Sequence, residues 1–461
     1  MSEESMPGDL PSREQRVASG GDNFGVSALT ERFRMTALAD EVMVRCETLA
    51  GISALPSGIS RAFLTREHRE ANDLVASWME AAGMCVREDG AGSVIGRFMA
   101  ERADAPVLVI GSHLDSVPNA GRYDGTLGVL LGIAAVERLR VLGRNLPFHV
   151  DVVGFGDEEG VRFGATLLSS RAMAGGWSDD WLALVDEQGS SLEQALRDFG
   201  LDPRAVDAAS RSRNALAGYL EVHIEQGPVL EQKGLPVGLV TAIAGTRRLL
   251  VTIRGQAGHA GTVPMSLRQD ALVGAAKGVA LLEATAVAYG VTATVGRLTC
   301  KPGGVNVIPG EVEFTIDIRA SDDGLRDTAL SAFLEQLNQI CAERTLELET
   351  KVMHEAPATP CSDWLQDELG KAIADHGLEV LRLVSGAGHD AMAMAAACPV
   401  AMLFVRCKGG ISHNPAESVD VADVTLALSV LVSAVERLAN ADPDSDMRAL
   451  VTSPAVAPIT R

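Results

Sequence analysis

The chain has 461 residues, which is enough for two or three domains with a sizeable hydrophobic core. Its 40 basic and 61 acidic side chains give a formal net charge of −21, so nucleic acid and anionic membranes are poor partners, and an anionic substrate needs local cations at its site. Seven scattered cysteines never occur in C-x-x-C spacing, which argues against a disulfide framework or a thiolate zinc site and favours a reducing cytoplasm.

The two ends of the chain are expected to lie outside the folded domains. Residues 1–27 are rich in Ser, Gly, Asp and Glu and lack the apolar core of a signal peptide, which predicts a disordered leader and no export. Residues 441–461 predict a flexible tail. The longest apolar run, residues 127–136, is shorter than the roughly 20 residues that a bilayer requires, so we expect a soluble protein.

The first part of the chain predicts a doubly wound α/β domain. A helix over residues 65–84 precedes a strand at 107–110, whose unbroken apolar sequence is typical of a parallel strand buried on both faces. A helix over 126–142 and a second strand at 150–155 complete a βαβ unit. We therefore expect a mostly parallel sheet with its ligand crevice at the carboxyl ends of the strands.

Residues 246–356 predict an inserted dimerisation or lid domain. Their elements follow the β-α-β-β-α-β order of a ferredoxin-like unit: strands at 249–254, 291–299, 311–319 and 346–353, with helices at 267–289 and 322–344. Apolar and polar residues alternate in the strand at 311–319, so one face of this sheet is polar and could serve a partner subunit. A helix at 361–376 and strands near 380–384 and 400–405 resume the first pattern. The catalytic domain is thus expected to comprise residues 28–245 and 357–440.

The end of the first strand carries candidate metal ligands. His113 and Asp115 follow the strand, and Asp124 begins the next helix. Residues i and i+2 of a strand point the same way, so Asp115 can accept a hydrogen bond from the ring nitrogen of His113 that a metal does not use. The alternative is a structural turn in which an aspartate caps a histidine, and this segment alone leaves both interpretations open.

The motif GFGDEEG follows the second strand. Its glycines suggest a dinucleotide loop, but Asp157, Glu158 and Glu159 place negative charge where a pyrophosphate must bind. Adjacent carboxylates instead suit a division of labour in which one binds a metal and its neighbour takes a proton from water. A solvated acidic turn is the alternative for this motif.

Two further histidines leave predicted strands. His223 lies in HIEQG after the run at 219–222, and His413 lies in GGISHNPAE after the strand at 400–405. A lone histidine is more often structural than a metal ligand. Three histidines and two or three carboxylates on the same side of a sheet, however, form a mixed nitrogen and oxygen set suited to zinc, manganese or cobalt.

These motifs together resemble a known family. The segments GSHLDSV, YDG, GDEEGVRF, HIEQGPVLE, GHAGT, SGAGHDA and SHNPAE, spread over roughly residues 39–438, resemble those of the M20-type metallo-amidohydrolases. Within that family they are similar to the branch that acts on ureido groups, which includes allantoate amidohydrolases, N-carbamoyl-L-amino acid hydrolases and β-ureidopropionases. The peptidases of the family usually carry a carboxylate where this chain has His223, which disfavours a peptidase.

The resemblance implies two divalent metal ions per subunit, zinc or manganese, with cobalt also acceptable. One ion is implied to be held by His113, Asp124 and His223. The other is implied to be held by Asp124, Glu159 and His413, so that Asp124 bridges the pair. Because a urea carbonyl is a poor electrophile, the metal has to polarise it.

Catalytic roles follow from the same resemblance. Glu158 is implied as the general base that takes a proton from water and returns it to the leaving nitrogen, with Asp115 in support. His259, in GHAGT, is the candidate donor that stabilises the negative charge of the tetrahedral intermediate. Since His259 lies in the inserted domain, the resemblance implies a homodimer with shared active sites, in which His259, Asn306 and Arg319 cross the interface.

Several residues are expected to contact a small anionic ureido substrate. Arg319 ends its strand on the polar side and can clamp a carboxylate, because its planar fork donates two parallel hydrogen bonds; an exposed arginine at a strand end is the alternative. By resemblance, Gln226, Gly388 and His389 bind the ureido and carboxylate ends, with Gly388 offering an exposed backbone N–H. His389 could instead only orient its loop, as could Glu417.

The resulting hypothesis is a binuclear metal-dependent hydrolase that cleaves a ureido C–N bond next to a carboxylate and releases ammonia and carbon dioxide. Allantoate is the first choice of substrate, because GDEEGVRF and LFVRCKGGISHNPAES resemble allantoate amidohydrolases. N-carbamoyl-L-amino acids and β-ureidopropionate are alternatives that the same residues would serve. A catalytically silent binding protein should have lost the base or a ligand, and this chain keeps them all.

Overall fold

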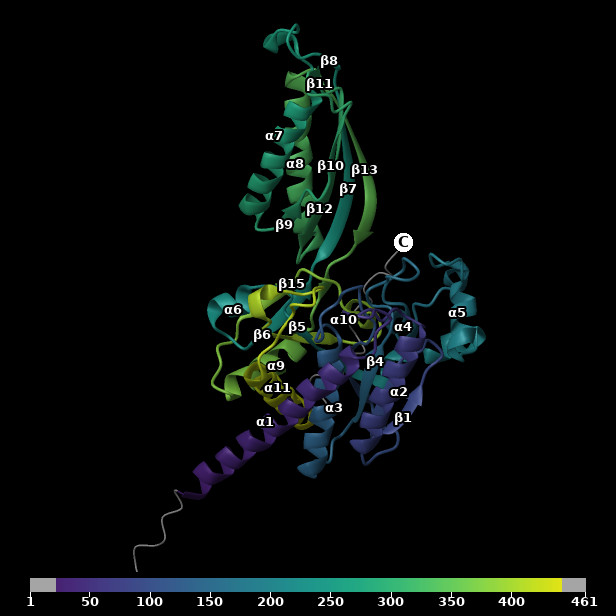
Figure 1. The fold of residues 1–461 in the computed structure, drawn as a ribbon. Coiled ribbons are helices and arrows are strands. Elements are labelled where there is room, and N and C mark those ends of the chain that lie inside the picture. Colours follow the sequence, from purple (N-terminus) through teal and green to yellow (C-terminus); the bar gives the residue numbers. More distant parts are fainter. Residues whose placement is uncertain (1–21, 442–461) are drawn as a thin grey trace, which may run out of the picture.

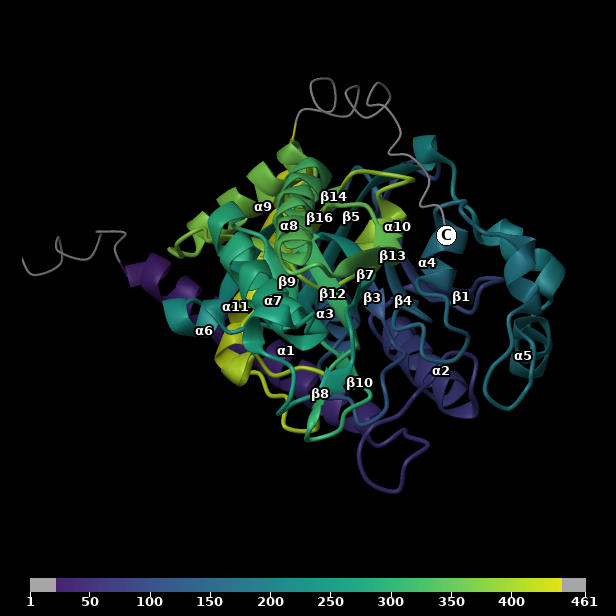
Figure 2. The same ribbon diagram turned by 90° about the horizontal axis from the view of Figure 1, so that it is seen from above.

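The chain folds into a larger α/β domain and a smaller domain that projects from it (Figure 1). The structure is a computed structural model that describes residues 22–441. Helix α1 (Asp22–Ala50) includes residues 22–27, which the sequence assigned to a disordered leader. The remainder of the expected leader, and the expected tail beyond residue 441, lie outside the described residues. Seen from above, the projecting domain overlies the middle of the larger domain (Figure 2).

A nine-stranded sheet organises the larger domain. Its order is β1-β2-β4-β3-β5-β16-β6-β14, and β15 pairs with β6. The strands are β1 (Cys85–Glu88), β2 (Val94–Phe98), β3 (Val107–His113), β4 (His149–Phe155), β5 (Leu216–Ile224), β6 (Val237–Ile243), β14 (Thr359–Pro360), β15 (Arg382–Ser385) and β16 (Val400–Val405). Strands β4, β3, β5 and β16 are parallel neighbours, whereas β2, β6 and β15 run the opposite way. The predicted mostly parallel sheet is confirmed, with antiparallel strands towards both edges.

Helices cover both faces of this sheet. One face packs against α1, α2 (Arg66–Ala81), α3 (Thr126–Val141), α9 (Asp363–Asp375) and α11 (Val421–Asn440). The other face packs against α4 (Leu168–Met173) and α10 (Asp390–Met394). Strand β3 is buried at every residue, which explains why its sequence is apolar without alternation. The doubly wound prediction is therefore confirmed.

Shorter elements lie at the periphery of the two domains. Helix α5 (Leu192–Phe199) belongs to a separate apolar cluster. The others are α6 (Val229–Lys233) and the 3-10 helices η2 (Asp179–Ala183), η3 (Pro203–Ala209), η4 (Arg213–Ala215), η5 (Met265–Leu267) and η6 (Lys408–Gly410).

The projecting domain consists of residues 245–356. Its five-stranded antiparallel sheet has the order β10-β12-β7-β13, with β9 also on β12. The elements are β7 (Gly245–Arg254), α7 (Ala271–Tyr289), β9 (Thr292–Thr294), β10 (Leu298–Lys301), β12 (Glu311–Ala320), α8 (Asp323–Glu343) and β13 (Glu347–Ala356). Both helices pack against this sheet, and β12 alternates buried and half-buried residues as expected.

One predicted strand of the projecting domain is wrong in detail. The strand expected at 291–299 is divided into β9 and β10. At the break the N–H of Arg297 donates to the side-chain oxygen of Thr315, while the carbonyl oxygen of Arg297 still accepts the N–H of Thr315. A further pair of short strands, β8 (Gly258–His259) and β11 (Val307–Ile308), lies at the end of the projecting domain farthest from the larger domain (Figure 1).

Helix α7 is the most apolar long helix of the described chain. By length and composition alone it could cross a membrane. It packs, however, against α8 and against strands β7, β9 and β12. Its outer side leaves Val287 80% exposed and Leu272 37% exposed. We therefore interpret α7 as a helix that covers the sheet on one side and presents an apolar surface on the other.

Candidate metal centre

The candidate metal ligands come together at the ends of neighbouring parallel strands. His113 is the last residue of β3, Glu159 follows β4, His223 is the penultimate residue of β5, His413 follows β16, and Asp124 lies just before α3. Three groups have ligand atoms within 4.8 Å of one another, and two of them are His113 with Asp124 and His223, and Asp124 with Glu159 and His413. These are the two ligand sets that the family resemblance implied.

Asp124 lies at the centre of the cluster. Its Oδ1 is 3.4 Å from Nε2 of His113 and 3.0 Å from Nε2 of His223. Its Oδ2 is 3.3 Å from Nε2 of His413, which in turn is 3.6 Å from Oε1 of Glu159. Burial opposes ionisation of Asp124, but the contacts with the three histidines hold its pKa well below the usual range. A buried carboxylate that faces three imidazoles is a suitable bridge between two cations.

The other ring nitrogens of two histidines are occupied by carbonyl oxygens. Nδ1 of His113 lies 3.0 Å from the carbonyl oxygen of Asp115, and Nδ1 of His223 lies 2.9 Å from that of Ile224. A carbonyl oxygen can only accept, so each Nδ1 carries a proton, and Nε2 is the nitrogen of each ring that faces Asp124 and is left for a metal. Both imidazoles are thus fixed in the tautomer that binds a metal through Nε2.

Asp115 differs from the expectation. Its carboxylate is 3.7 Å from Nδ1 of His113, too far for the predicted hydrogen bond, and it accepts the backbone N–H groups of Glu158 and Glu159 at 3.2 Å each. The prediction assumed an extended backbone, but β3 ends at His113 and the chain turns there. Asp115 therefore supports the acidic turn through its side chain and orients His113 through its main chain.

The acidic turn after β4 is buried and crowded with negative charge. Burial, together with the neighbouring carboxylates, raises the pKa of Glu158 well above its usual range, and burial likewise raises the pKa of Glu159. Asp157 is fully buried, has a φ of 66°, and both its carboxylate oxygens lack a partner among the described residues. Such a concentration of buried carboxylates fits a centre that binds cations.

Three residues that the sequence did not assign to the metal centre support it, two of them at Asp124 and one at Asp115. Ser412 donates to Asp124 Oδ2 at 2.6 Å, and Glu417 accepts the N–H groups of Tyr123 at 2.7 Å and Asp124 at 3.2 Å. Their signal was present, since both belong to the SHNPAE motif. The third is Arg61, which is 2% exposed and whose charge acts on Asp115; no motif pointed to it.

Gln226 also reaches the bridging carboxylate. Its Nε2 donates to Asp124 Oδ2 at 2.9 Å and to the hydroxyl of Ser412 at 3.1 Å, while its Oε1 is buried without a partner. Its φ of 56° is unusual for a residue other than glycine. The structure therefore places Gln226 beside the metal centre, where it could face a substrate.

The loop between β15 and α10 joins the metal centre through Gly388. An atom at the Cβ position of Gly388 would lie 3.7 Å from Oε1 of Glu158, so the backbone there is close to the candidate base. His389 does not face the same space. Its ring is 1% exposed, packs edge-on against His223 with centroids 4.5 Å apart, and places Nε2 2.7 Å from the hydroxyl of Ser385. This burial favours the alternative, in which His389 orients its loop, and a contact with the substrate stays a prediction.

His259 and Asn306 lie together but away from the metal centre. Residue 259 pairs with Val307 across β8 and β11, and the carbonyl oxygen of Asn306 accepts the N–H of Ala260 at 2.9 Å. These strands are at the far end of the projecting domain, whereas the metal ligands belong to the larger domain (Figure 1). Within one chain, neither residue reaches the metal centre in this conformation.

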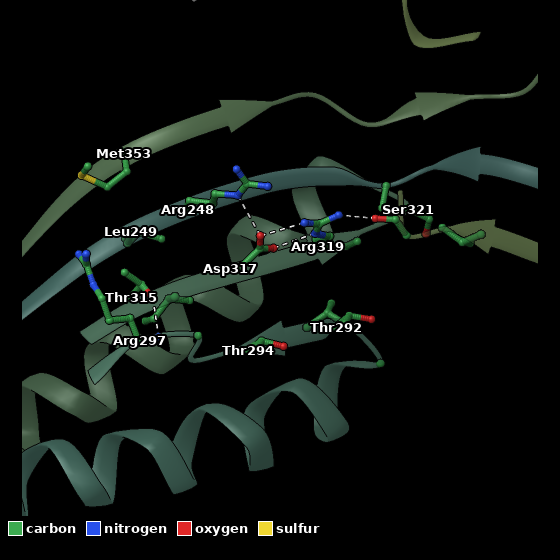
Figure 3. A pocket seen from close by; sticks show the side chains of 18 residues that line it. Arg248, Leu249, Thr292, Thr294, Arg297, Thr315, Asp317, Arg319, Ser321 and Met353 are labelled. Carbon is green, nitrogen blue, oxygen red and sulfur yellow. Dashed lines mark hydrogen bonds and ion pairs between the residues drawn. The ribbon is translucent and has the colours of Figure 1, made fainter. Parts of the chain in front are cut away.

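Arg319 lies elsewhere, where the projecting domain meets the larger one. Its guanidinium donates to both carboxylate oxygens of Asp317, at 2.8 and 2.9 Å, and to the carbonyl oxygen of Gly386 in the same chain (Figure 3). Arg319 therefore contacts the loop of its own chain that also carries Gly388, and its expected role across a subunit interface stays a prediction.

The donor set fits two divalent ions. It combines three imidazoles and two or three carboxylates, and none of the described groups that could hold a metal contains a cysteine. Zinc, manganese and cobalt all accept such ligands. Gly125, with a φ of 68°, leaves room for this arrangement, because a Cβ atom there would lie 2.5 Å from the ring of His113.

A doubly wound domain whose strand ends gather histidines and carboxylates, joined to a projecting domain, has the architecture of a metallohydrolase. Residues 109–437 match the peptidase family M20/M25/M40, and the chain belongs to this family. It is 42% identical over 400 residues to an N-carbamoyl-L-amino acid amidohydrolase of Geobacillus stearothermophilus, covering 86% of this chain and 98% of that protein. It is 40% identical over 422 residues to the allantoate deiminase of Arabidopsis thaliana, covering 85% of this chain and 80% of that protein.

A solved structure has the same fold. The amidase of the hydantoinase/carbamoylase family from Burkholderia multivorans superposes with a TM-score of 0.82 at 32% identity, covering 87% of this chain and 98% of that one. The predicted recognition of an M20-type amidohydrolase is confirmed, and the chain is an enzyme of the amidohydrolase class.

Proposed function

We propose that this protein is a binuclear metal-dependent amidohydrolase that cleaves the C–N bond of a ureido group on a small carboxylate and releases ammonia and carbon dioxide. Allantoate is the proposed substrate, and N-carbamoyl-L-amino acids or β-ureidopropionate are the alternatives. The observation that carries the proposal is the position of Asp124 between two ligand groups, with Glu158 beside them. Relatives named for allantoate and for N-carbamoyl-L-amino acids support both choices.

The metal ligands are proposed as the two groups described above. His113 and His223 would hold one ion and Glu159 and His413 the other, with Asp124 available to both. Zinc or manganese is the proposed metal, with cobalt as a substitute. When bound, the ions polarise the ureido carbonyl and increase the acidity of a water molecule.

Glu158 is the proposed general base. Its carboxylate lies in the same group of ligand atoms as His113 and Glu159, and burial makes it more basic than an exposed glutamate. It takes a proton from the attacking water and returns that proton to the leaving nitrogen. Asp115 holds the turn that carries Glu158 in place by accepting its backbone N–H.

A homodimer is the proposed assembly, with His259 and Asn306 supplied to the site of the partner subunit. Two observations support it: both residues lie at the tip of the projecting domain, and α7 presents exposed apolar residues next to β9, a strand at the edge of the sheet that pairs with β12. An edge strand has unpaired N–H and C=O groups, and a second copy of the chain can pair with them. His259 would then donate to the developing oxyanion of the intermediate.

The cytoplasm is the proposed compartment. All seven cysteines lie in the described part of the chain and none forms a disulfide. Burial raises the pKa of Cys361 to about 12 and that of Cys407 to about 11, so these thiols stay protonated and unreactive. Free cysteines of this kind are typical of a reducing compartment.

The test is ammonia release by the protein after removal of its metals and separate reloading with zinc, manganese or cobalt. The substrates are allantoate, N-carbamoyl-L-amino acids and β-ureidopropionate, with dipeptides assayed by amine detection. We expect metal-dependent release from allantoate. Broad turnover of carbamoyl amino acids selects the alternative substrate with the same site, whereas dipeptide cleavage alone, or no turnover with any metal, contradicts the proposal.

A further inference from the structure

A cavity of about 920 Å³ lies where the projecting domain meets the larger one (Figure 3). Strands β7, β9 and β12 supply half of its lining residues, and Val384 and Gly386 of the larger domain contribute to the rest. Its lining contains three guanidinium groups, those of Arg248, Arg297 and Arg319, but only one carboxylate, that of Asp317. In a chain with a net charge of −21, this cavity is a local concentration of positive charge suited to an anion.

Asp317 fixes the guanidinium group of Arg319. Nε of Arg319 donates to Oδ1 of Asp317 at 2.8 Å, and Nη2 donates to Oδ2 at 2.9 Å. Because residues 317 and 319 lie on the same face of β12, this pair closes within one strand. Nη1 donates to the carbonyl oxygen of Gly386. A guanidinium has five N–H donors, so about two remain for a ligand.

Asp317 is itself held from the neighbouring strand. Arg248 of β7 is its direct cross-strand partner, and Nε of Arg248 donates to Oδ2 of Asp317 at 2.9 Å. Figure 3 shows Asp317 between the two arginines. Burial opposes its ionisation, but the bonds from Arg319 and Arg248 lower the pKa of Asp317 below its usual value. The carboxylate is therefore charged and anchored on two sides.

We propose that Asp317 is a positioning residue that holds Arg319 in the orientation that binds the carboxylate of the substrate, with Arg248 anchoring Asp317. The inference rests on the proposed function and extends it to residues that do not touch the substrate. An arginine whose fork is already immobilised loses less side-chain entropy when a carboxylate binds. Asp317 thus strengthens substrate binding and the preference for a carboxylate, without taking part in the chemical step.

The competing possibility is that Asp317 weakens substrate binding. Asp317 is an anion inside the cavity, so its charge also repels an incoming carboxylate. If repulsion dominated, Asp317→Asn would lower KM. If positioning dominates, as proposed, the same substitution raises KM, because an asparagine has one acceptor oxygen and places an NH2 group against the other guanidinium N–H.

The experiment compares kcat and KM of Asp317→Asn and of the wild type, using the best ureido substrate and its carboxamide analogue. For the carboxylate we expect KM to rise about tenfold with kcat nearly unchanged, and for the carboxamide we expect little change. Glu311→Gln is the matched control, since Glu311 lies on the same face of β12 and pairs with Arg254 and Lys301 outside the cavity. It should leave both constants at wild-type values.

A double-mutant cycle tests whether Asp317 acts through Arg319. In an Arg319→Gln background, Asp317→Asn should raise KM no further, because the group that it orients is gone. An equal rise of KM in both backgrounds, an equal rise for the carboxamide, or a lower KM in the single variant would each overturn the inference.

The failure of the proposed function is distinguishable from the failure of this inference. If the wild type hydrolyses no ureido substrate with any metal, the proposed function is wrong. Calorimetric titration of the metal-free protein with allantoate then tests Asp317 without chemistry. Binding about tenfold weaker in Asp317→Asn supports the inference, whereas unchanged binding, or no binding to the wild type, overturns it.

Discussion

The individual residues at the metal centre adopt uncommon backbone conformations. Asp157, Gln226 and His413 have φ values of 66°, 56° and 53°, and they account for three of the seven described residues other than glycine with positive φ. Such conformations cost free energy and persist only where the surrounding contacts impose them. The ligands and the acidic turn are therefore held by the fold before any metal binds.

Glu158 allows a test at the level of one atom. Glu158→Gln keeps the shape and the backbone bonds to Asp115 but removes the proton acceptor. We expect both metals to remain bound and kcat to fall by about a thousandfold or more. Metal content by elemental analysis and kcat on the best substrate check this. A rate near that of the wild type would remove Glu158 from the mechanism.

Gly121 is a second residue whose substitution has a defined consequence. A Cβ atom at Gly121 would lie 2.0 Å from the carboxyl carbon of Glu417, which is 1% exposed and cannot move freely. Gly121→Ala should displace Glu417, leave the N–H groups of Tyr123 and Asp124 without partners, and lower the free energy of unfolding by about 2 kcal/mol.

Urea unfolding of the metal-free protein measures this loss, and a metal titration should show weaker binding because Asp124 is disturbed. Gly176→Ala is the control, since the nearest atom to a Cβ there is 3.6 Å away. Equal stability of the two variants would contradict the steric argument.

Among the elements, strand β5 connects the metal centre to helix α10. Glu221 of β5 accepts the hydroxyl of Ser112 at 3.1 Å and the N–H of Ala391 at 2.9 Å, and it lies 3.1 Å from the hydroxyl of Tyr219. Ser112 precedes a metal ligand on β3, and Ala391 lies in the first turn of α10. One buried carboxylate therefore joins two strands and a helix whose preceding loop reaches Glu158.

A graded pair of substitutions tests this junction. Glu221→Ala should lower the free energy of unfolding by about 3 kcal/mol or more, because it leaves several buried donors unpaired. Tyr219→Phe removes only one hydroxyl and should cost about 1 kcal/mol. Urea unfolding of both variants gives the comparison, and an equal loss in the two would show that Glu221 is not the common partner.

At the scale of the whole molecule, the distance between the tip of the projecting domain and the metal centre is the decisive feature. It predicts that His259→Ala and Glu158→Gln chains complement each other. After dissociation and random re-pairing, half of the dimers are mixed and each has one complete site, so we expect up to about one quarter of wild-type activity. No recovery despite heterodimers verified by mass spectrometry would contradict shared sites.

The predictable part of this protein followed from patterns within short segments. Unbroken apolar runs indicated β3 and β16 because strands buried on both faces need no alternation. Alternation along β12 indicated a sheet with one polar face. Parallel strands end at the same edge, so histidines and carboxylates after successive strands were expected to meet, and the structure groups His113, Asp124 and His223.

Other features required the packed chain. Asp115 reaches the backbone of Glu158 and Glu159, and Glu417 reaches that of Asp124, across 43 or more positions of sequence. Periodicity describes which face of an element is buried, but it does not describe how the turns between elements aim a side chain. The burial of His389 could not be predicted for the same reason, because its loop contains no regular element whose periodicity would show which side is buried.

The amino-acid sequence was thus sufficient for the fold class, the family and the set of candidate ligands, because hydrophobic periodicity and motif spacing are local properties of the chain. The partners of Asp115, the Asp317–Arg319 pair beside Gly386 and the separation of His259 from the metals were not accessible to it. These depend on contacts between distant segments and on the placement of two domains, which only the assembled three-dimensional structure establishes.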